Sequence, residues 1–90
     1  MSQQQLETLF EFPCSFPIKV MAEQGAPLQD IVSQALTDVG IDASRVQMQT
    51  RASSSGRYLS ITAIFTAESK EQLDRLYQLL TAHPEIKMVL

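Results

Sequence analysis

The stretch that decides the fold is RVQMQTRASSSGRYLSITAIFT, residues 45–66. In 45–52 and again in 58–66 the polarity of the side chains alternates with a period of two residues, which is typical of half-buried β-strands. The SSSG segment between them is typical of a turn, and Gly56 suits a left-handed turn position. We therefore predict a β-hairpin over this stretch. One face of its second strand is apolar, formed by Leu59, Ile61, Ala63 and Phe65.

A helix is predicted before the hairpin, over residues 27–39. Pro27 suits the first helical position, where its missing N–H is no loss, and Gly40 stands where a helix stop is expected. The apolar residues between them recur at helical spacing and form one stripe: Leu28, Ile31, Val32, Ala35, Leu36 and Val39.

A second helix is predicted after the hairpin. Ser69 and Gln72 have the spacing of a capping box at its start. It is expected to end at His83, because the residue before a proline avoids helical geometry. Its buried stripe is Leu73, Leu76, Tyr77 and Leu80.

One further strand is predicted at each end of the folded chain. Residues 15–21 alternate, and Pro17 is expected among the first residues of that strand because it cannot donate a ladder hydrogen bond. Residues 86–90, IKMVL, form a short apolar strand at the other end. A loop at 23–26, which holds Gly25, connects the first strand to the first helix.

The order strand, helix, strand, strand, helix, strand predicts an α+β protein with a ferredoxin-like βαββαβ fold. The single stripe on each helix places both helices on one face of a four-stranded antiparallel sheet, and leaves the other face to water or a partner. The second and fourth strands are the expected edges. We assign residues 13–90 to this single domain and residues 1–12 to a flexible N-terminal arm, with a turn of helix at 6–10.

Composition narrows the class of protein. The 90 residues suffice for one domain, and the net charge of −3 disfavours nucleic-acid binding. Tyr58 is the one aromatic expected on the exposed side of its strand, which is too few for an RNA-stacking platform. The N-terminus lacks the features of a signal peptide, and no stretch is long and apolar enough for a membrane span. Together with a single cysteine, these features lead us to expect a cytoplasmic protein without a membrane partner.

Three segments resemble the YbeD-like family of small, uncharacterised bacterial proteins. The family pattern FP-x-x-F-x-x-K-V-M falls on residues 12–21, S-x-G-x-Y-x-S falls on 54–60, and the terminal M-V-L falls on 88–90. The resemblance covers residues 9–90. It implies a ferredoxin-like fold similar to ACT-type regulatory domains, and it implies no activity.

No catalytic constellation is found, so we expect a protein that is not an enzyme. Cys14 lacks a partner for a CxxC pair and a nearby histidine in sequence, and we interpret it as a packing residue. His83 is interpreted as a helix C-terminal residue, and one Cys with one His is too few for a metal site. A site similar to that of acylphosphatases would require an arginine in the loop after the first strand and an asparagine on a neighbouring strand. The chain contains no asparagine. We therefore predict no catalytic, metal or cofactor site.

The charges are distributed unevenly. Lys19, Arg51 and Lys87 are predicted to project from strands onto the open face, while the acids are expected in the arm, helices and loops, with none inside a strand. The open face is then mildly positive on an acidic protein. We predict a candidate interaction face composed of Lys19, Met21, Arg51, Tyr58, Ser60, Thr62, Lys87 and Val89. The alternative is a solvated sheet surface with scattered apolar residues.

The leading functional hypothesis is a non-enzymatic cytosolic binding or regulatory module. It would act through the open face or a sheet edge, as a homodimer or on a cytosolic protein partner. The alternative is an ACT-like sensor of a small anionic metabolite or amino acid, bound at a dimer edge or at the 23–27 loop. Residues 53–60 would either contact a ligand or only form a turn, and the sequence does not name the partner.

Overall fold

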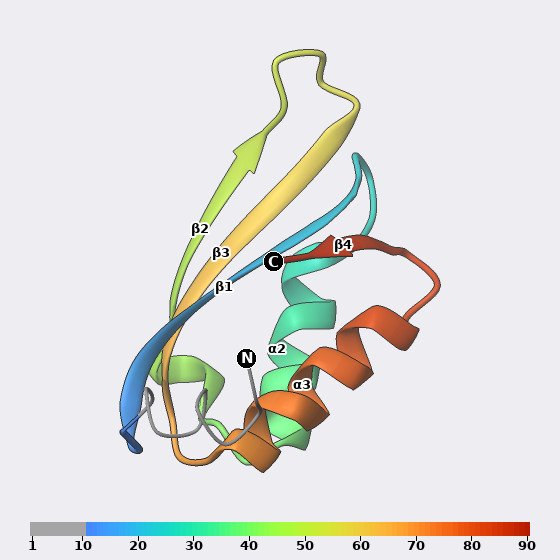
Figure 1. Cartoon of the computed structure of the whole chain (residues 1–90). Helices are drawn as coiled ribbons and strands as arrows, with labels where there is room; N and C mark the ends of the chain where they lie inside the picture. The colour runs from blue at the N-terminus through green and yellow to red at the C-terminus, as the bar shows by residue number, and fades with distance from the viewer. Residues whose placement is uncertain (1–10) are drawn as a thin grey trace, which may run out of the picture.

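The computed structural model describes residues 11–90, which form a β-sheet with two helices packed on one side of it (Figure 1). The element order confirms the predicted ferredoxin-like βαββαβ pattern. The elements are β1 (Cys14–Glu23), α2 (Leu28–Asp38), the 3₁₀ turn η1 (Ala43–Arg45), β2 (Gln47–Ala52), β3 (Tyr58–Ala67), α3 (Lys70–Ala82) and β4 (Ile86–Val89).

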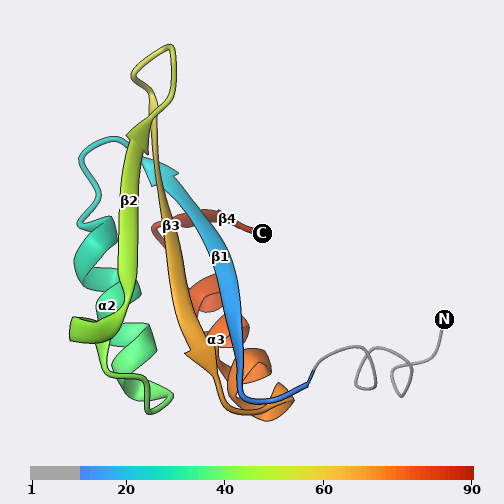
Figure 2. The same ribbon diagram turned by 90° about the vertical axis from the view of Figure 1, so that its left-hand side faces the viewer.

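The sheet contains four antiparallel strands from residues 11–90, in the order β2-β3-β1-β4. As predicted, β2 and β4 are its edges. Figure 2 looks onto the sheet from the side without helices, with β2, β3 and β1 in front and both helices behind. In the central pair, Ile18 lies opposite Ala63 and Val20 opposite Ile61, so the apolar residues of both strands face the helices together.

The hydrophobic core lies between this sheet and the helices. The predicted stripes supply its helical half, and their fully buried members are Leu28, Val32, Leu36, Leu76 and Leu80. Ile31, Val39 and Tyr77 belong to the same stripes but are only partly buried at the rim of the core. Cys14 is the first residue of β1 and packs against this core, which agrees with its interpretation as a packing residue.

Hydrogen bonds define where α2 ends and where α3 begins, and one of them links the two helices. Gly40 has φ +87°, and the Ile41 N–H donates to the Leu36 carbonyl oxygen over 2.9 Å, so α2 stops in the wrapped-back conformation that glycine permits. At the start of α3, Ser69 Oγ accepts from the Gln72 N–H over 3.1 Å, as the capping box predicts. The Gln72 amide then donates to the carbonyl oxygen of Val39 over 2.9 Å, which ties the two helices together.

The turn between β2 and β3 is closed by its own hydrogen bonds. The Gly56 N–H donates to the Ser53 carbonyl oxygen over 2.9 Å, and the Tyr58 N–H donates to Ser53 Oγ over 3.1 Å. Gly56 has φ +73°, the left-handed conformation predicted for it. The hairpin extends beyond the helical layer (Figure 1), and Thr50 and Ala52 are therefore exposed although they lie on the helix side of the sheet.

Two expectations concern the boundaries of the domain. Phe12 is partly buried against the core, so the packed unit includes a residue that we had assigned to the arm. The predicted turn of helix at 6–10 lies outside the described residues. Among residues 11–90, no helix is long and apolar enough to span a membrane.

Candidate functional site on the open sheet face

Strand register decides which side chains meet on the open face, the side of the sheet away from α2 and α3. Two rows of open-face positions cross all four strands. The first row runs from β2 to the residue that follows β4, and it is Gln49, Thr62, Lys19 and Leu90. The second row is Arg51, Ser60, Met21 and Met88.

One predicted face residue is on the wrong side. Val89 lies opposite Val20 and packs against the core, so its assignment to the open face is wrong. The cause is an irregularity in β4. Met21 pairs with Met88 while the next residue, Ala22, pairs with Ile86, which leaves Lys87 as an extra residue in the ladder. Such a bulge interrupts the alternation on which the prediction relied, and it brings Met88 to the open face instead.

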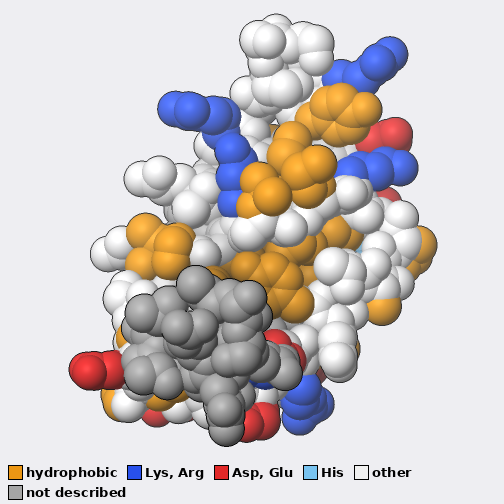
Figure 3. All heavy atoms as spheres, viewed as in Figure 1, with side chains coloured by type: hydrophobic (Ala, Val, Ile, Leu, Met, Phe, Trp, Pro, Cys, Tyr) orange, Lys and Arg blue, Asp and Glu red, His pale blue; other side chains and the backbone are white. Residues whose placement is uncertain are grey.

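The bulge creates an apolar surface that the sequence did not suggest. Met21 on β1, Met88 on β4 and Leu90 directly after β4 adjoin one another, and we call them the β4 apolar patch. Met88 is 50% exposed and Leu90 is 61% exposed, which is high for large apolar side chains. Figure 3 shows hydrophobic side chains gathered over this part of the molecule, with Lys and Arg side chains on both sides of them.

Beside the patch, two cations line a shallow hollow of about 440 Å³. Lys19 comes from β1 and Arg51 from β2, and both side chains are exposed. Between them lies Ser60, which is only 8% exposed. Its hydroxyl donates to the Arg51 carbonyl oxygen over 3.3 Å. We call this the Lys19–Arg51 hollow, and its remaining lining residues are Gln49, Thr50 and Thr62.

One acidic residue on the open face was not predicted from the sequence. Glu23 is the last residue of β1 and stands on the open face opposite Tyr58, so the prediction that no acid lies inside a strand is wrong. Its carboxylate is 3.8 Å from the ammonium of Lys87. Both side chains are more than half exposed, so this ion pair adds little stability, but it offsets one positive charge at the corner of the face. Lys19 and Arg51 form no ion pair with a residue in 11–90.

The Glu23–Lys87 ion pair lies beside the 23–27 loop, which is one of the two locations that we expect for an anionic ligand. A hollow beside that loop is lined by Glu23, Glu85 and Lys87 together with uncharged residues of 24–26 and Pro84. Two carboxylates and one ammonium give this hollow a net negative charge. Its charge therefore disfavours an anionic ligand, in contrast to that of the Lys19–Arg51 hollow.

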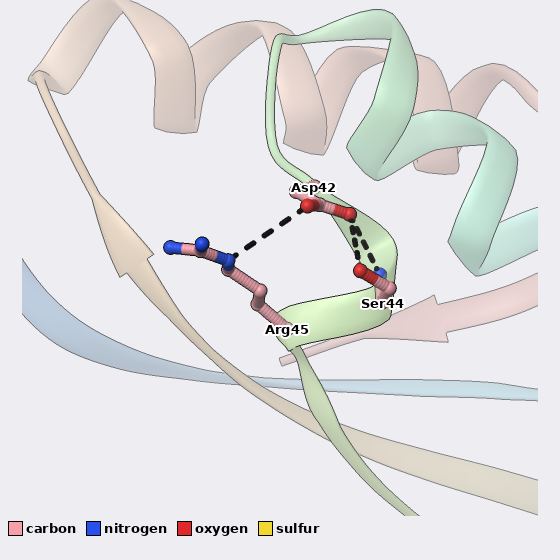
Figure 4. A network of polar contacts seen from close by, with 3 residues as sticks. All are labelled: Asp42, Ser44 and Arg45. Atoms are coloured by element: carbon pink, nitrogen blue, oxygen red, sulfur yellow. Dashed lines mark hydrogen bonds and ion pairs between the residues drawn. The ribbon is translucent and has the colours of Figure 1, made fainter.

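A second polar cluster lies at the opposite end of the sheet, around η1 (Figure 4). The Ser44 hydroxyl and N–H donate to Asp42 Oδ1 over 2.6 and 3.0 Å, and Arg45 Nε is 3.9 Å from Oδ2. These contacts, the Ser44 hydroxyl first, hold the pKa of the Asp42 carboxyl below its usual 3.8. Because Asp42 is the N-cap residue of η1, the cluster has a structural role: it caps the 3₁₀ turn that leads from α2 to β2.

The described chain shows no arrangement that would hold a metal ion. No group of three or more His, Cys, Asp or Glu side chains is clustered for that purpose within residues 11–90. His83 caps the end of α3, as predicted, and its Nδ1 accepts from the Glu85 N–H over 3.2 Å. The polar groups on the open face are ammonium, guanidinium, hydroxyl, amide and thioether groups, together with the carboxylate of Glu23 at its corner.

Comparison with known proteins places the chain in a family. The sequence model described as "Protein of unknown function (DUF493)" matches residues 7–90. This chain belongs to the DUF493 family. Its relatives are called UPF0250 proteins: the one from Paraburkholderia phytofirmans is 45% identical over 86 residues, covering 93% of this chain and 94% of the relative. The one from Neisseria gonorrhoeae is 37% identical over 91 residues, covering 100% of both chains.

A solved structure supports the fold of this DUF493 chain. It is similar to the solution structure of protein HP0495 from H. pylori, with a TM-score of 0.70 and 11% identity. The match covers 90% of this chain and 85% of the other. At that identity the likeness shows the ferredoxin-like fold alone. The family comparison confirms the resemblance to YbeD-like proteins that three sequence segments had indicated.

Proposed function

We propose that this protein is a non-enzymatic binding or regulatory module whose open sheet face docks on an acidic surface of a partner protein. The observation that carries the proposal is the union, on one face, of the β4 apolar patch with the cations Lys19 and Arg51. Exposed apolar side chains gain free energy when a partner removes them from water, and flanking charges select the partner and its orientation.

The charges of the face favour a different protein over a second copy of this chain. Lys19, Arg51 and Lys87 outweigh Glu23, so two open faces brought together would oppose like charges. Like-charge juxtaposition across an interface costs several kcal/mol. An acidic partner surface meets the same groups with complementary charge.

The strand edge adds a second element to the same surface. β4 is an edge strand, and two exposed apolar residues, Met88 within it and Leu90 directly after it, belong to the patch. An apolar edge that continues into an apolar face is a surface that natural proteins cover rather than leave open. A partner seated on the face would cover both.

The test is recovery of the tagged full chain from its bacterial host in low salt, followed by native mass spectrometry. The wild type is compared with a face variant, Lys19→Glu with Arg51→Glu, and with a control, Arg45→Glu with Arg75→Glu. The control makes the same change in net charge at exposed positions that do not line the Lys19–Arg51 hollow. Thermal melts of all three proteins establish that the variants are folded.

The proposal expects a second chain that stays with the wild type and the control and is lost from the face variant. It also expects that added salt releases the partner, because exposed charges are screened. A partner retained equally by the face variant would refute docking through this face. Recovery of the wild type only as a homodimer, without a second chain, would refute an acidic partner protein.

A further inference from the structure

The Lys19–Arg51 hollow has the composition of an oxyanion site. Lys19 and Arg51 stand on strands separated by β3, two strand spacings or about 9.5 Å apart, and their long side chains border the same hollow. No acid lines the hollow among the described residues, and Thr62 and Gln49 add hydroxyl and amide donors. A guanidinium binds a carboxylate or a phosphate through two parallel hydrogen bonds, and an ammonium adds a point charge.

The hollow adjoins an apolar surface, which narrows the kind of ligand. Its floor is formed by Ser60 and Thr62 on β3, whereas the β4 apolar patch lies over β1 and β4. The two are separated by one and a half strand spacings, about 7 Å. A ligand that uses both must carry a negative group and an apolar group at that separation.

We propose that the Lys19–Arg51 hollow receives the carboxylate of an aspartate or glutamate side chain from the partner, while an apolar side chain of the same segment covers the β4 apolar patch. This inference rests on the proposed function, because it names what the open face recognises. In an extended segment, residues two apart lie on the same side and about 6.8 Å apart, which matches the separation of hollow and patch.

The exposure of the two cations favours a protein side chain over a free anion. Lys19 and Arg51 are both exposed, so a small anion between them would remain largely hydrated and would gain little from either contact. A protein segment that also covers Met88 and Leu90 excludes water from the hollow, and that strengthens each charge contact.

The experiment titrates the ¹⁵N-labelled full chain with two capped pentapeptides and follows its amide resonances. One peptide is acetyl-Leu-Thr-Glu-Thr-Leu-amide, and the other has glutamine in place of glutamate. The same titrations are repeated on Lys19→Gln, on Arg51→Gln, and on the control Arg57→Gln, whose arginine does not line the hollow. Inorganic phosphate is titrated separately.

The proposal expects saturable shifts of the amides of residues 19, 49–51 and 60–62 with the glutamate peptide. The glutamine peptide should bind roughly fivefold more weakly, the ratio expected for partly exposed charge contacts. That preference should disappear in Lys19→Gln and in Arg51→Gln and persist in Arg57→Gln.

Equal binding of the two peptides to the wild type, or a preference that survives both substitutions in the hollow, would overturn the proposal. So would phosphate that shifts the same amides at lower concentration than the glutamate peptide, because the hollow would then be a site for a free anion. These outcomes are separate from those for the proposed function. The docking face can retain its partner while the peptides show no carboxylate preference, and the peptides can show the preference when no partner is recovered.

Discussion

Lys19 and Leu90 exchange both backbone hydrogen bonds. The Lys19 N–H donates to the Leu90 oxygen over 3.0 Å, and the Leu90 N–H donates to the Lys19 carbonyl oxygen over 2.8 Å. Residues that pair in this way share a face of the sheet, so Leu90 stands beside the Lys19 side chain on the open face. This pair places Leu90 in the candidate site and joins the apolar part of the site to its cationic part.

The bulge at Lys87 predicts opposite tolerances at two adjacent positions. Met88→Ser should change the free energy of unfolding by less than about 0.5 kcal/mol, because the side chain is half exposed. Val89→Ser should cost about 1–2 kcal/mol, because it removes apolar packing from a residue that contacts the core. Urea denaturation of the two variants measures the difference. Regular alternation through β4 would reverse the order, so a larger loss at Met88 would contradict the bulge.

This bulge shows where sequence patterning stops being informative. Alternation in 15–21 and 58–66 located the open-face residues of β1 and β3 correctly, because those strands pair without interruption along their length. In β4 one extra residue changes the side on which every following residue falls, and nothing in IKMVL marks it. A strand of 4 residues is too short for its pattern to reveal such a slip.

A second prediction concerns two adjacent leucines in α3. Leu80 is fully buried between the helices and the sheet, whereas Leu79 is 38% exposed. Leu80→Ala should therefore lower the free energy of unfolding by about 2–5 kcal/mol, through lost burial and the cavity left behind. Leu79→Ala should cost less than about 1 kcal/mol, because alanine favours the helix and less apolar area is lost. The denaturant midpoints of the two variants, compared at an unchanged m-value, measure the difference. Similar losses of unfolding free energy at both positions would argue against the observed orientation of α3.

A third prediction concerns the amide of Gln72, which joins the two helices. Its Nε2 donates to the Val39 carbonyl oxygen over 2.9 Å, and its Oε1 accepts from the Glu68 N–H over 2.8 Å. Gln72→Ala removes both bonds and should cost about 1–2 kcal/mol, since a partly buried carbonyl loses its donor. Gln72→Glu keeps an acceptor for Glu68 but loses the donor to Val39, so it should also destabilise the protein.

The control for this prediction lies in the same helix. Gln78 is exposed, and Gln78→Ala should leave the denaturation midpoint almost unchanged. If Gln72→Ala behaved like Gln78→Ala, the link between α2 and α3 would have no energetic significance. The capping-box spacing predicted the helix start at Ser69, but it gave no sign that the glutamine side chain also reaches the other helix.

The sequence pattern predicts that Lys19 and Arg51 lie on the open face, but it does not predict that they border one hollow. Lys19 and Arg51 follow from alternation alone, because each sits in a regularly paired strand. Their approach to one hollow depends on which strands are neighbours, and the small Ser60 between them creates the space. Glu23 was assigned to a loop because Gly25 follows closely, yet β1 continues through it. Such contacts between distant segments are set by register, which a single sequence does not display.

The last prediction uses the pKa of Asp42, which the Ser44 hydroxyl and N–H and the Arg45 guanidinium hold below 3.8. A carboxyl whose pKa is lower in the folded chain stabilises the fold above its unfolded value, and this contribution is lost as the pH falls through the lower, folded value. Asp42→Asn keeps an N-cap acceptor without the charge. The melting temperature of the wild type should therefore exceed that of Asp42→Asn above pH 3.8, and the difference should shrink at lower pH. In a Ser44→Ala background, where the strongest of these contacts is gone, the pH dependence should flatten. A difference that stayed constant down to about pH 2.5 would show that the Asp42 charge is not the source of the stabilisation.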